Sequence, residues 1–301
     1  MGTTPAERRP DDAPPSGERA AAAAADPAHA GHAVQRALRV VLIVFTVGLY
    51  FALSPFGYVL CAVVLLIPTR DPSRRTRRLQ AIVQVAFRAM FSWASLVRIM
   101  HFDWRAARAG LNLPPGPAVI VANHPTLTDP LMVGAVVPNL SMVAKPVVYR
   151  RALIRPLLRG LGYVNGASQD PRSVQRLLDE AGAVLGQGMR FLVFPEGTRS
   201  PRDGLYPFGR SAFEIACRSR VPLISVLLRS EPRFLWKGAG FMRPPHPASR
   251  LSLELLNHYD PTDFDLDSRA LRLAVESDYR RALQPPPPTD GPPAPHQETA
   301  P

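Results

Sequence analysis

A long uncharged stretch constrains the fold of this chain most. No charged residue occurs over the 28 positions from Val40 to Ile67 of the 301-residue sequence. A continuous helix of that length would rise by roughly 42 Å, whereas about 20 residues cross the core of a bilayer. Pro55 interrupts the stretch, and a proline inside a helix kinks or breaks it. The stretch therefore predicts a membrane anchor, either one kinked spanning helix or two short helices that dip into one leaflet. A buried core helix is the remaining alternative.

Basic residues gather directly after this stretch. Residues 70–110 contain nine arginines and two aspartates, in a chain whose formal net charge is +12. Such a cluster favours either nucleic acid or an anionic membrane surface as the partner. Apolar residues recur at helical spacing between 79 and 97, with Arg88 and Arg98 among them, which predicts a basic amphipathic helix lying on the membrane. Because no zinc finger and no RNA-binding pattern of alternating aromatic and basic residues occurs, we expect membrane lipid, and no nucleic acid, as the anionic partner.

The remainder of the chain alternates between strand and helix patterns. Strands separated by helical segments predict an α/β fold with a mostly parallel central sheet and flanking helices, preceded by the membrane-anchoring helical segment. We divide the chain into a disordered N-terminal tail (1–33), an anchor with the basic amphipathic helix (34–110), a catalytic domain (111–283) and a proline-rich disordered tail (284–301). The expected strands are 118–122, 140–144, 162–165, 190–194, 221–228 and 250–256, and the expected helices are 130–137, 150–159, 171–187, 208–219 and 268–283.

A histidine and an aspartate follow the first of these strands. Pro125 favours an extended conformation for His124, and Asp129-Pro130 is a good helix start with Asp129 as the N-cap. A turn followed by a helix start can fold the aspartate back onto the imidazole, where a carboxylate on one ring nitrogen fixes the tautomer. We therefore predict that His124 is a general base for a hydroxyl group and that Asp129 is its partner. The alternative is that Asp129 only caps its helix and His124 is an ordinary loop residue.

A second polar loop follows the strand at 190–194. In this loop Gly197 permits a positive φ angle, Thr198 offers a hydroxyl, and Arg199 offers a planar fork for phosphate or carboxylate. Glu196 either accepts a hydrogen bond from a substrate hydroxyl or braces the loop. Because the carboxyl ends of parallel strands share one edge of a sheet, this anion-holding loop should lie beside the base. The alternative is a tight turn whose Arg199 points into solvent.

At these residues the chain resembles a known family, the glycerolipid acyltransferases of the lysophosphatidic acid type. Residues 123–129, Asn-His-Pro-Thr-Leu-Thr-Asp, match the family's block of a histidine and an aspartate separated by four residues. Residues 194–200, Phe-Pro-Glu-Gly-Thr-Arg-Ser, match its Phe-Pro-Glu-Gly-Thr-Arg block almost letter for letter. Residues 221–224, Val-Pro-Leu-Ile, are similar to its Val-Pro-Ile-Val block, and Val143-Ala144-Lys145 resembles a recurrent stretch between the first two blocks. The resemblance covers roughly residues 38–256.

The resemblance implies a glycerol-phosphate acyltransferase-like fold and direct transfer of a fatty acyl group from a thioester to a lipid hydroxyl. It implies that His124 deprotonates the acceptor, that Asp129 orients His124, and that the loop at 196–199 positions the polar head of the acceptor. The substrate-binding residues expected on this basis are Glu196, Gly197, Thr198, Arg199, Arg210 and Lys145. The donor would be acyl-carrier protein or acyl-coenzyme A, with no further cofactor and no metal. We expect a membrane location, with the catalytic domain on the cytoplasmic side because the arginines follow the anchor.

Two customary phosphate contacts of that family are missing or moved in this chain. The family's second block often ends in an arginine, whereas residues 162–166 here read Gly-Tyr-Val-Asn-Gly. A lysine usual after the third block is replaced at residues 208–211 by Phe-Gly-Arg-Ser, where Arg210 is a candidate substitute. The resemblance to a variant group for specialised lipids, through Tyr163-Val164-Asn165 and Lys237-Gly238, points the same way. Two alternatives therefore stay open: acylation of a non-glycerophosphate acceptor, such as a polyene or amino-lipid, and a non-catalytic membrane adaptor.

Overall fold

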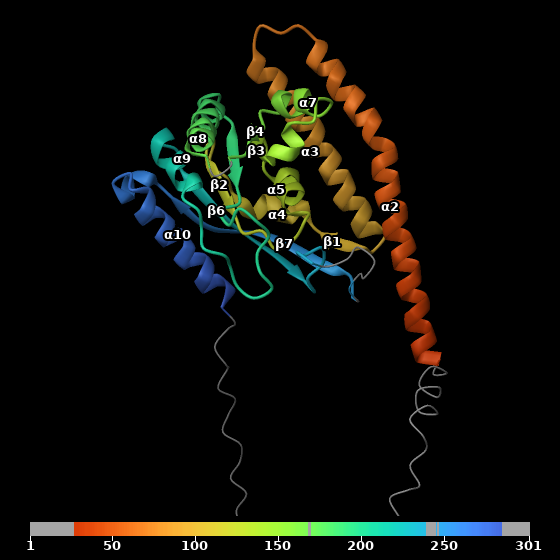
Figure 1. The fold of residues 1–301 in the computed structure, drawn as a ribbon. Coiled ribbons are helices and arrows are strands. Elements are labelled where there is room, and N and C mark those ends of the chain that lie inside the picture. Colours follow the sequence, from red (N-terminus) through yellow and green to blue (C-terminus); the bar gives the residue numbers. More distant parts are fainter. Residues whose placement is uncertain (1–26, 168–169, 239–244, 246, 285–301) are drawn as a thin grey trace, which may run out of the picture.

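The computed structural model describes residues 27–167, 170–238, 245 and 247–284. The predicted tails lie mostly outside this range, except that residues 27–33 belong to a helix and not to a disordered tail. The centre of the molecule is a seven-stranded sheet in the order β1-β7-β6-β2-β5-β3-β4, with helices against both faces (Figure 1). All neighbouring strands are parallel except β6 and β7. The predicted α/β fold with a mostly parallel sheet is therefore confirmed.

The strands and helices have the following bounds. The strands are β1 (Met100–Phe102), β2 (Val119–Ala122), β3 (Leu140–Ala144), β4 (Val164–Asn165), β5 (Arg190–Val193), β6 (Leu223–Glu231) and β7 (Ser249–Tyr259). The helices are α2 (Pro27–Leu66), α3 (Pro72–Leu96), α4 (Trp104–Leu111), α5 (Asp129–Val136), α6 (Pro146–Tyr149), α7 (Arg155–Gly160), α8 (Pro171–Gly186), α9 (Ser211–Ser219) and α10 (Ser268–Leu283), with a short 3-10 helix at Pro261–Phe264.

Strand β2 lies between two hydrophobic cores, one on each face of the sheet. Val119 and Val121 pack into the core formed with α8, α9 and α10, whereas Ile120 and Ala122 pack into the core formed with α3, α4 and α5. All four side chains are completely buried. Burial on both faces explains why this strand reads as a continuous apolar run, which is typical of parallel sheets. The polar loop after β2 thus starts from one of the most rigidly held segments of the chain.

Several elements differ from the sequence-based expectation. The helix expected at 150–159 is replaced by α6 and α7, because Pro146 and Pro156 each occupy the first turn of a separate short helix. Strand β1 and helix α4 were not predicted, since a three-residue strand leaves no periodic signal. Strand β1 pairs with β7 at the edge of the sheet. Residues before the predicted boundary at 110/111 thus contribute a strand to the central sheet.

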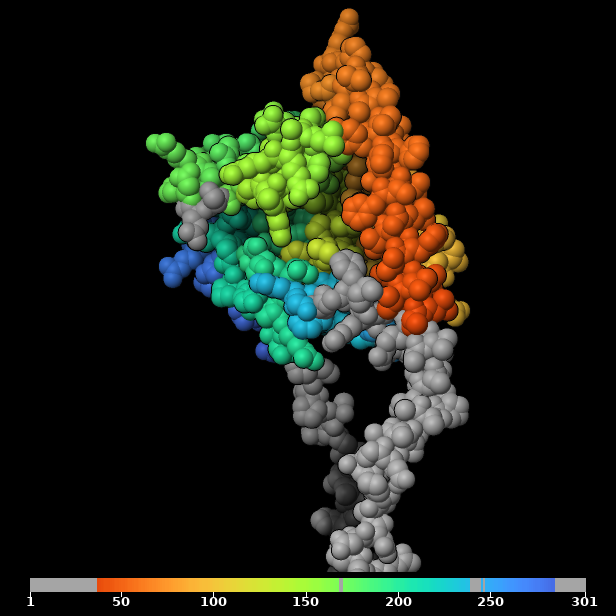
Figure 2. Space-filling model, turned by 45° about the vertical axis from the view of Figure 1, so that its right-hand side comes forward, coloured from red at the N-terminus to blue at the C-terminus, as the bar shows by residue number. Residues whose placement is uncertain are grey.

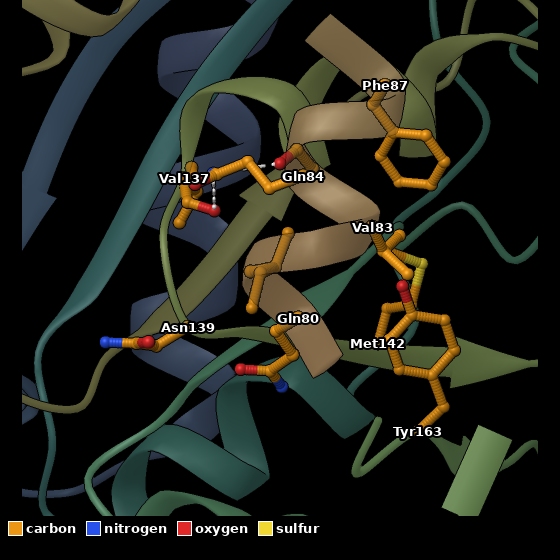
Figure 3. Close-up of a pocket in the computed structure, with 10 residues that line it drawn as sticks. Gln80, Val83, Gln84, Phe87, Val137, Asn139, Met142 and Tyr163 are labelled. Atoms are coloured by element: carbon orange, nitrogen blue, oxygen red, sulfur yellow. Dashed lines mark hydrogen bonds between the residues drawn. The ribbon is translucent and has the colours of Figure 1, made fainter. Parts of the chain in front are cut away.

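Helix α3 is the predicted amphipathic helix, but the protein itself covers much of its apolar face. Leu79 and Phe91 are completely buried. The Nε2 group of Gln84 donates hydrogen bonds to the carbonyl oxygens of Gly134 (3.0 Å) and Val137 (2.9 Å), which ties α3 to the end of α5 (Figure 3). A cavity of only about 10 Å³ remains beneath the helix there, the size of one water molecule. The prediction that this face lies on the membrane is wrong for these residues, because an apolar stripe does not specify which apolar partner covers it.

Helix α2 is continuous through Pro55 and runs along one side of the molecule beside α3 (Figure 1). The alternative of two short helices is therefore contradicted. The part from Ala37 to Leu66 is long and apolar enough to cross a membrane, with a mean hydropathy of 2.1, and only 6% of that apolar window is buried. This exposure contradicts the alternative of a buried core helix. The outer surface of α2 lies open to the surroundings in the space-filling view (Figure 2).

Candidate active site

His124 and Asp129 meet at the carboxyl end of β2. The Nδ1 atom of His124 lies 2.8 Å from Oδ2 of Asp129. The Asp129 side chain is 1% exposed and the His124 side chain 17% exposed. A carboxylate at Nδ1 fixes the proton on that nitrogen and leaves the lone pair on Nε2. Within the described residues no protein atom forms a hydrogen bond with Nε2, so this nitrogen is available as an acceptor.

The Asp129 carboxylate serves the turn and not the helix. It accepts hydrogen bonds from the backbone N–H of Thr126 (2.7 Å) and from its hydroxyl (2.5 Å). Thr128 occupies the N-cap position of α5, so the expectation that Asp129 is the N-cap is wrong. Burial raises the pKa of the Asp129 carboxyl, while the hydrogen bonds from His124 and Thr126 act in the opposite direction. These three donors hold the carboxylate in one orientation.

Two further contacts fix the position of the imidazole. The ring of Phe194, the first residue after β5, stacks on the His124 ring with centroids 4.3 Å apart. The amide of Asn123 exchanges two hydrogen bonds with the backbone of Leu228, at 2.9 and 2.8 Å, and thereby joins β6 to the point where β2 ends. The histidine is thus held from its own loop, from β5 and from β6.

Glu196 braces the two loops against each other. Its Oε1 atom accepts hydrogen bonds from the hydroxyl of Ser200 (2.5 Å) and from the backbone N–H of His124 (3.2 Å), and its Oε2 atom accepts one from the N–H of Tyr206 (3.0 Å). The N–H of Ser200 donates to the carbonyl oxygen of His124 at 2.8 Å. Both carboxylate oxygens of Glu196 thus take part in hydrogen bonds that connect the two loops, while its contact with a substrate stays a prediction.

The rest of this loop is arranged around a glycine turn. Gly197 is exposed and has φ +65°, the positive value that its residue type permits. Thr198 is half-buried, and within the described residues its hydroxyl has no hydrogen-bond partner. Arg199 is half-buried and donates from Nη1 to the carbonyl oxygen of Leu235 at 3.1 Å. The alternative in which Arg199 points into solvent is therefore wrong.

Lys145 and Arg210 stand apart from this arrangement. Lys145 is exposed and follows β3, so it lies at the same edge of the sheet but two strands away from β2. Arg210 is exposed just before α9 and contributes, after the hydrogen bond from Arg218, to lowering the pKa of Glu214. Among the described residues neither cation donates a hydrogen bond to His124, Glu196 or Arg199. The structure thus brings six of the candidate residues together, namely the four from Glu196 to Arg199 and the pair His124 and Asp129, and leaves Lys145 and Arg210 apart.

Sequence reasoning missed the partners of these residues. Thr126 and Ser200 lie inside the recognised blocks, but their residue types alone did not indicate that they bond to Asp129 and Glu196. The carbonyl oxygen of Leu235 accepts hydrogen bonds both from Arg199 and from the N–H of Leu127 (3.1 Å). Leu235 has φ +57°, which is uncommon for a residue other than glycine. No residue-type signal reveals a backbone carbonyl of this kind.

Comparison with known proteins agrees with the geometry. A sequence profile described as acyltransferase matches residues 108–229, a range that contains both loops. This part of the chain is thus similar to the acyltransferase family.

The curated proteins similar to this chain carry a common description. The chain is 28% identical over 149 residues to a chloroplastic 1-acyl-sn-glycerol-3-phosphate acyltransferase, BAT2, of Brassica napus, a match that covers 49% of this chain and 43% of that protein. It is 28% identical over 137 residues to human 1-acyl-sn-glycerol-3-phosphate acyltransferase alpha, covering 43% of this chain and 47% of that protein. The chain therefore spans about half the length of the curated relatives it matches.

A solved structure shares the fold of this chain. The crystal structure of the 1-acyl-sn-glycerophosphate acyltransferase PlsC from Thermotoga maritima superimposes with a TM-score of 0.61 at 22% sequence identity. The match covers 83% of this chain and 95% of that chain, so it extends well beyond the region of the sequence profile. No group of three or more histidine, cysteine, aspartate or glutamate side chains suited to a metal ion occurs in the part of the chain that the structure describes.

Proposed function

We propose that this protein is an acyltransferase that moves a fatty acyl group from an acyl thioester to a hydroxyl group of a lysophospholipid or glycerolipid at a membrane. The observation that carries the proposal is the 2.8 Å contact between His124 and Asp129, which leaves Nε2 open beside a loop that carries Arg199. The descriptions of the relatives support a glycerolipid as the acceptor. Acyl-coenzyme A or acyl-carrier protein serves as the donor, and no further cofactor takes part.

The geometry supports a direct transfer in one active site. Nε2 of His124 removes the proton of the acceptor hydroxyl while that oxygen attacks the carbonyl carbon of the thioester. Asp129 stabilises the imidazolium that forms, because its carboxylate already accepts the Nδ1 proton. When the carbon–sulfur bond breaks, the thiolate leaves and His124 returns the proton to it. No covalent acyl-enzyme is needed, since a thiolate is a good leaving group.

The loop at 196–199 binds the polar head of the acceptor in this proposal. Arg199 supplies the guanidinium fork for an anionic head group, and the Thr198 hydroxyl supplies a further hydrogen-bonding group. Lys145 and Arg210, which are exposed, complete the positive edge at which an anionic lipid arrives. Glu196 acts on the acceptor only indirectly, because both of its carboxylate oxygens already accept hydrogen bonds from the protein.

We place the protein at the membrane through α2. Arg39 donates to the carbonyl oxygen of Pro245 (2.7 Å), and Tyr58 donates to that of Leu153 (2.9 Å). Near the other end of the helix, Gly160 of α7 packs so closely on Leu65 that an added Cβ would lie 2.6 Å from it. Arg39 and Leu65 are about 39 Å apart along a helix, more than the roughly 30 Å of a bilayer core. Because the domain contacts both ends, we favour a helix that lies along one leaflet, on the cytoplasmic side.

A non-glycerophosphate acceptor is the second candidate. It is favoured by the segment at 162–166, which supplies no arginine, and by the separation of Lys145 and Arg210 from the catalytic loops. A polyene or amino-lipid would need fewer cations at the site than lysophosphatidic acid does.

The test is a mass-spectrometric assay of the purified full chain with both kinds of thioester against a panel that includes lysophosphatidic acid. We expect transfer to an anionic lysolipid, and at least a hundredfold loss of kcat in His124→Ala. His258→Ala removes an exposed histidine from β7 and serves as the matched control with unchanged activity. Activity of His124→Ala within twofold of the wild type refutes the proposed base. Preference for uncharged acceptors over every anionic one selects the second candidate.

A further inference from the structure

A larger cavity lies at the amino-terminal end of β5, whereas the catalytic pair lies at the carboxyl ends of the parallel strands. It has a volume of about 480 Å³, and its lining includes Arg75, Thr76, Arg155, Arg159 and Met189. Met189 directly precedes β5, whereas Phe194, which stacks on His124, directly follows the same strand. The cavity and the imidazole therefore lie at opposite ends of β5. In Figure 1 the neighbouring helix α7 lies close to the turn between α2 and α3. The cavity is thus separate from the proposed acceptor site.

The lining of this cavity is positively charged and uncompensated. Three arginines line it, and no acidic residue does. Arg75 donates from Nη1 to the carbonyl oxygen of Leu65 at 3.2 Å, which holds its guanidinium group beside the end of α2. The side chains of Arg155 and Arg159 are exposed and take part in no hydrogen bond or ion pair with the described residues. Guanidinium groups that line one cavity without carboxylates suit the charge and the hydrogen-bonding needs of a phosphate group.

Apolar surface adjoins these cations. Leu65 lines the cavity itself, and the next two residues, Leu66 and Ile67, are 81% and 48% exposed. Exposed apolar side chains next to a cluster of arginines suit a ligand with an anionic head and a hydrocarbon tail, and they do not suit a fully soluble anion. The cavity also offers the hydroxyl of Thr76, which has no hydrogen-bond partner among the described residues.

We propose that this cavity binds the phosphate group of an anionic membrane phospholipid, whose acyl chains lie along the exposed end of α2. The site is a second lipid site that does not take part in acyl transfer. It holds the α2–α3 turn and α7 at the level of the lipid head groups. The proposal is independent of the acyl-transfer reaction, because no lining residue belongs to the catalytic loops.

The test is a titration of the detergent-solubilised full chain with phosphatidylglycerol, followed by native mass spectrometry. The double variant Arg155→Gln/Arg159→Gln should raise the Kd for phosphatidylglycerol at least tenfold. The control double variant Arg250→Gln/Arg269→Gln removes the same charge from two other exposed positions and should change the Kd by less than twofold. Because the four arginines are exposed, both variants should keep the Tm of the wild type within a few degrees. Equal weakening in the two double variants overturns the site, since it indicates only a general effect of net charge.

Two further arms identify the source of the phosphate. Inorganic phosphate and phosphatidylcholine should each bind at least tenfold more weakly than phosphatidylglycerol. Binding of inorganic phosphate as tight as that of the lipid, with the same loss in Arg155→Gln/Arg159→Gln, overturns the lipid assignment in favour of a soluble anion. His124→Ala should leave this binding unchanged even though it removes acyl transfer. Loss of phosphatidylglycerol binding in His124→Ala would instead place the lipid in the acceptor site.

Discussion

The catalytic loop (residues 123–129) and the cations around it are fixed to very different degrees. In the loop, Asp129 accepts three hydrogen bonds and His124 is held through its ring and its backbone. Lys145 and Arg210 are exposed, and no described residue accepts a hydrogen bond from their side chains. Arg199 lies between these extremes, with one hydrogen bond to a carbonyl oxygen. A group that transfers a proton must be oriented in advance, whereas a group that binds a charged lipid can become ordered when the lipid arrives.

The largest effect should come from the carboxylate that orients the base. Asp129→Asn keeps the shape of the side chain but replaces one acceptor oxygen by an N–H donor facing His124 or Thr126. The imidazole then loses its fixed tautomer, and kcat should fall by about 10³ to 10⁴, with little change in KM. Steady-state kinetics on the full chain measure this split. A fall of less than tenfold would show that the orientation of His124 does not depend on Asp129.

A smaller effect is expected from the brace between the loops. Glu196→Gln retains one acceptor oxygen, so one of the two sets of donors, Ser200 with His124 or Tyr206, loses its partner. We expect a loss of about 1–3 kcal/mol of stability and a fall in kcat of about tenfold. The Tm and the kcat should fall together. If instead only KM for the acceptor rises, Glu196 contacts the substrate. It would then belong with the binding residues and not with the residues that orient His124.

Arg199 should affect binding more than chemistry. Arg199→Ala should raise KM for an anionic acceptor by about 10- to 100-fold, because a charge-assisted hydrogen bond contributes roughly 1.5–3 kcal/mol. Arg199→Lys keeps the charge but lacks the planar fork, so it should give an intermediate KM. A fall confined to kcat would place Arg199 in the transition state and so among the oriented groups.

The smallest effects are expected from the two free cations. Lys145→Ala and Arg210→Ala should each raise KM for an anionic acceptor by less than about fivefold, because exposed charges act through a screened field. Raising the salt concentration from 0.05 to 0.5 M, ionic strengths chosen to span about a threefold change in screening length, should remove the difference from wild type. An effect of either variant that persists at high salt would indicate a direct contact with the bound acceptor.

Local geometry explains which parts of this site could be predicted. The contact between His124 and Asp129 joins residues five apart, and Pro125 together with the helix start restricts the chain between them. The role of Glu196 stayed open because its partners lie on two different loops, one of them 72 residues away. The carbonyl oxygen of Leu235 could not be predicted at all, since every residue type carries the same backbone. Sequence patterns therefore predicted the contact between His124 and Asp129 and missed most of the hydrogen bonds that hold the two residues in place.

The same distinction applies to the fold. Strand β2 was predictable because two-sided burial leaves a continuous apolar run at 118–122. The partner that covers the apolar face of α3 could not be predicted, because an apolar stripe fits a membrane and a protein core equally well. In the structure the side chain of Gln84 donates hydrogen bonds to the end of α5, so α3 packs on the protein. The spacing of apolar residues does not predict this contact. Strand β1 acquires its place only through its long-range pairing with β7.

The carbonyl oxygen of Leu235 connects the proposed acceptor-binding residue to the catalytic loop. It is shared by Arg199, which would grip the head group, and by the N–H of Leu127, which belongs to the catalytic loop. When the guanidinium of Arg199 binds the lipid instead, the Leu235 oxygen accepts a hydrogen bond from Leu127 alone. Binding of the acceptor would therefore change the hydrogen bonding of the turn that carries His124. In the proposed function, this one peptide group therefore connects binding of the acceptor at Arg199 to the loop that carries His124.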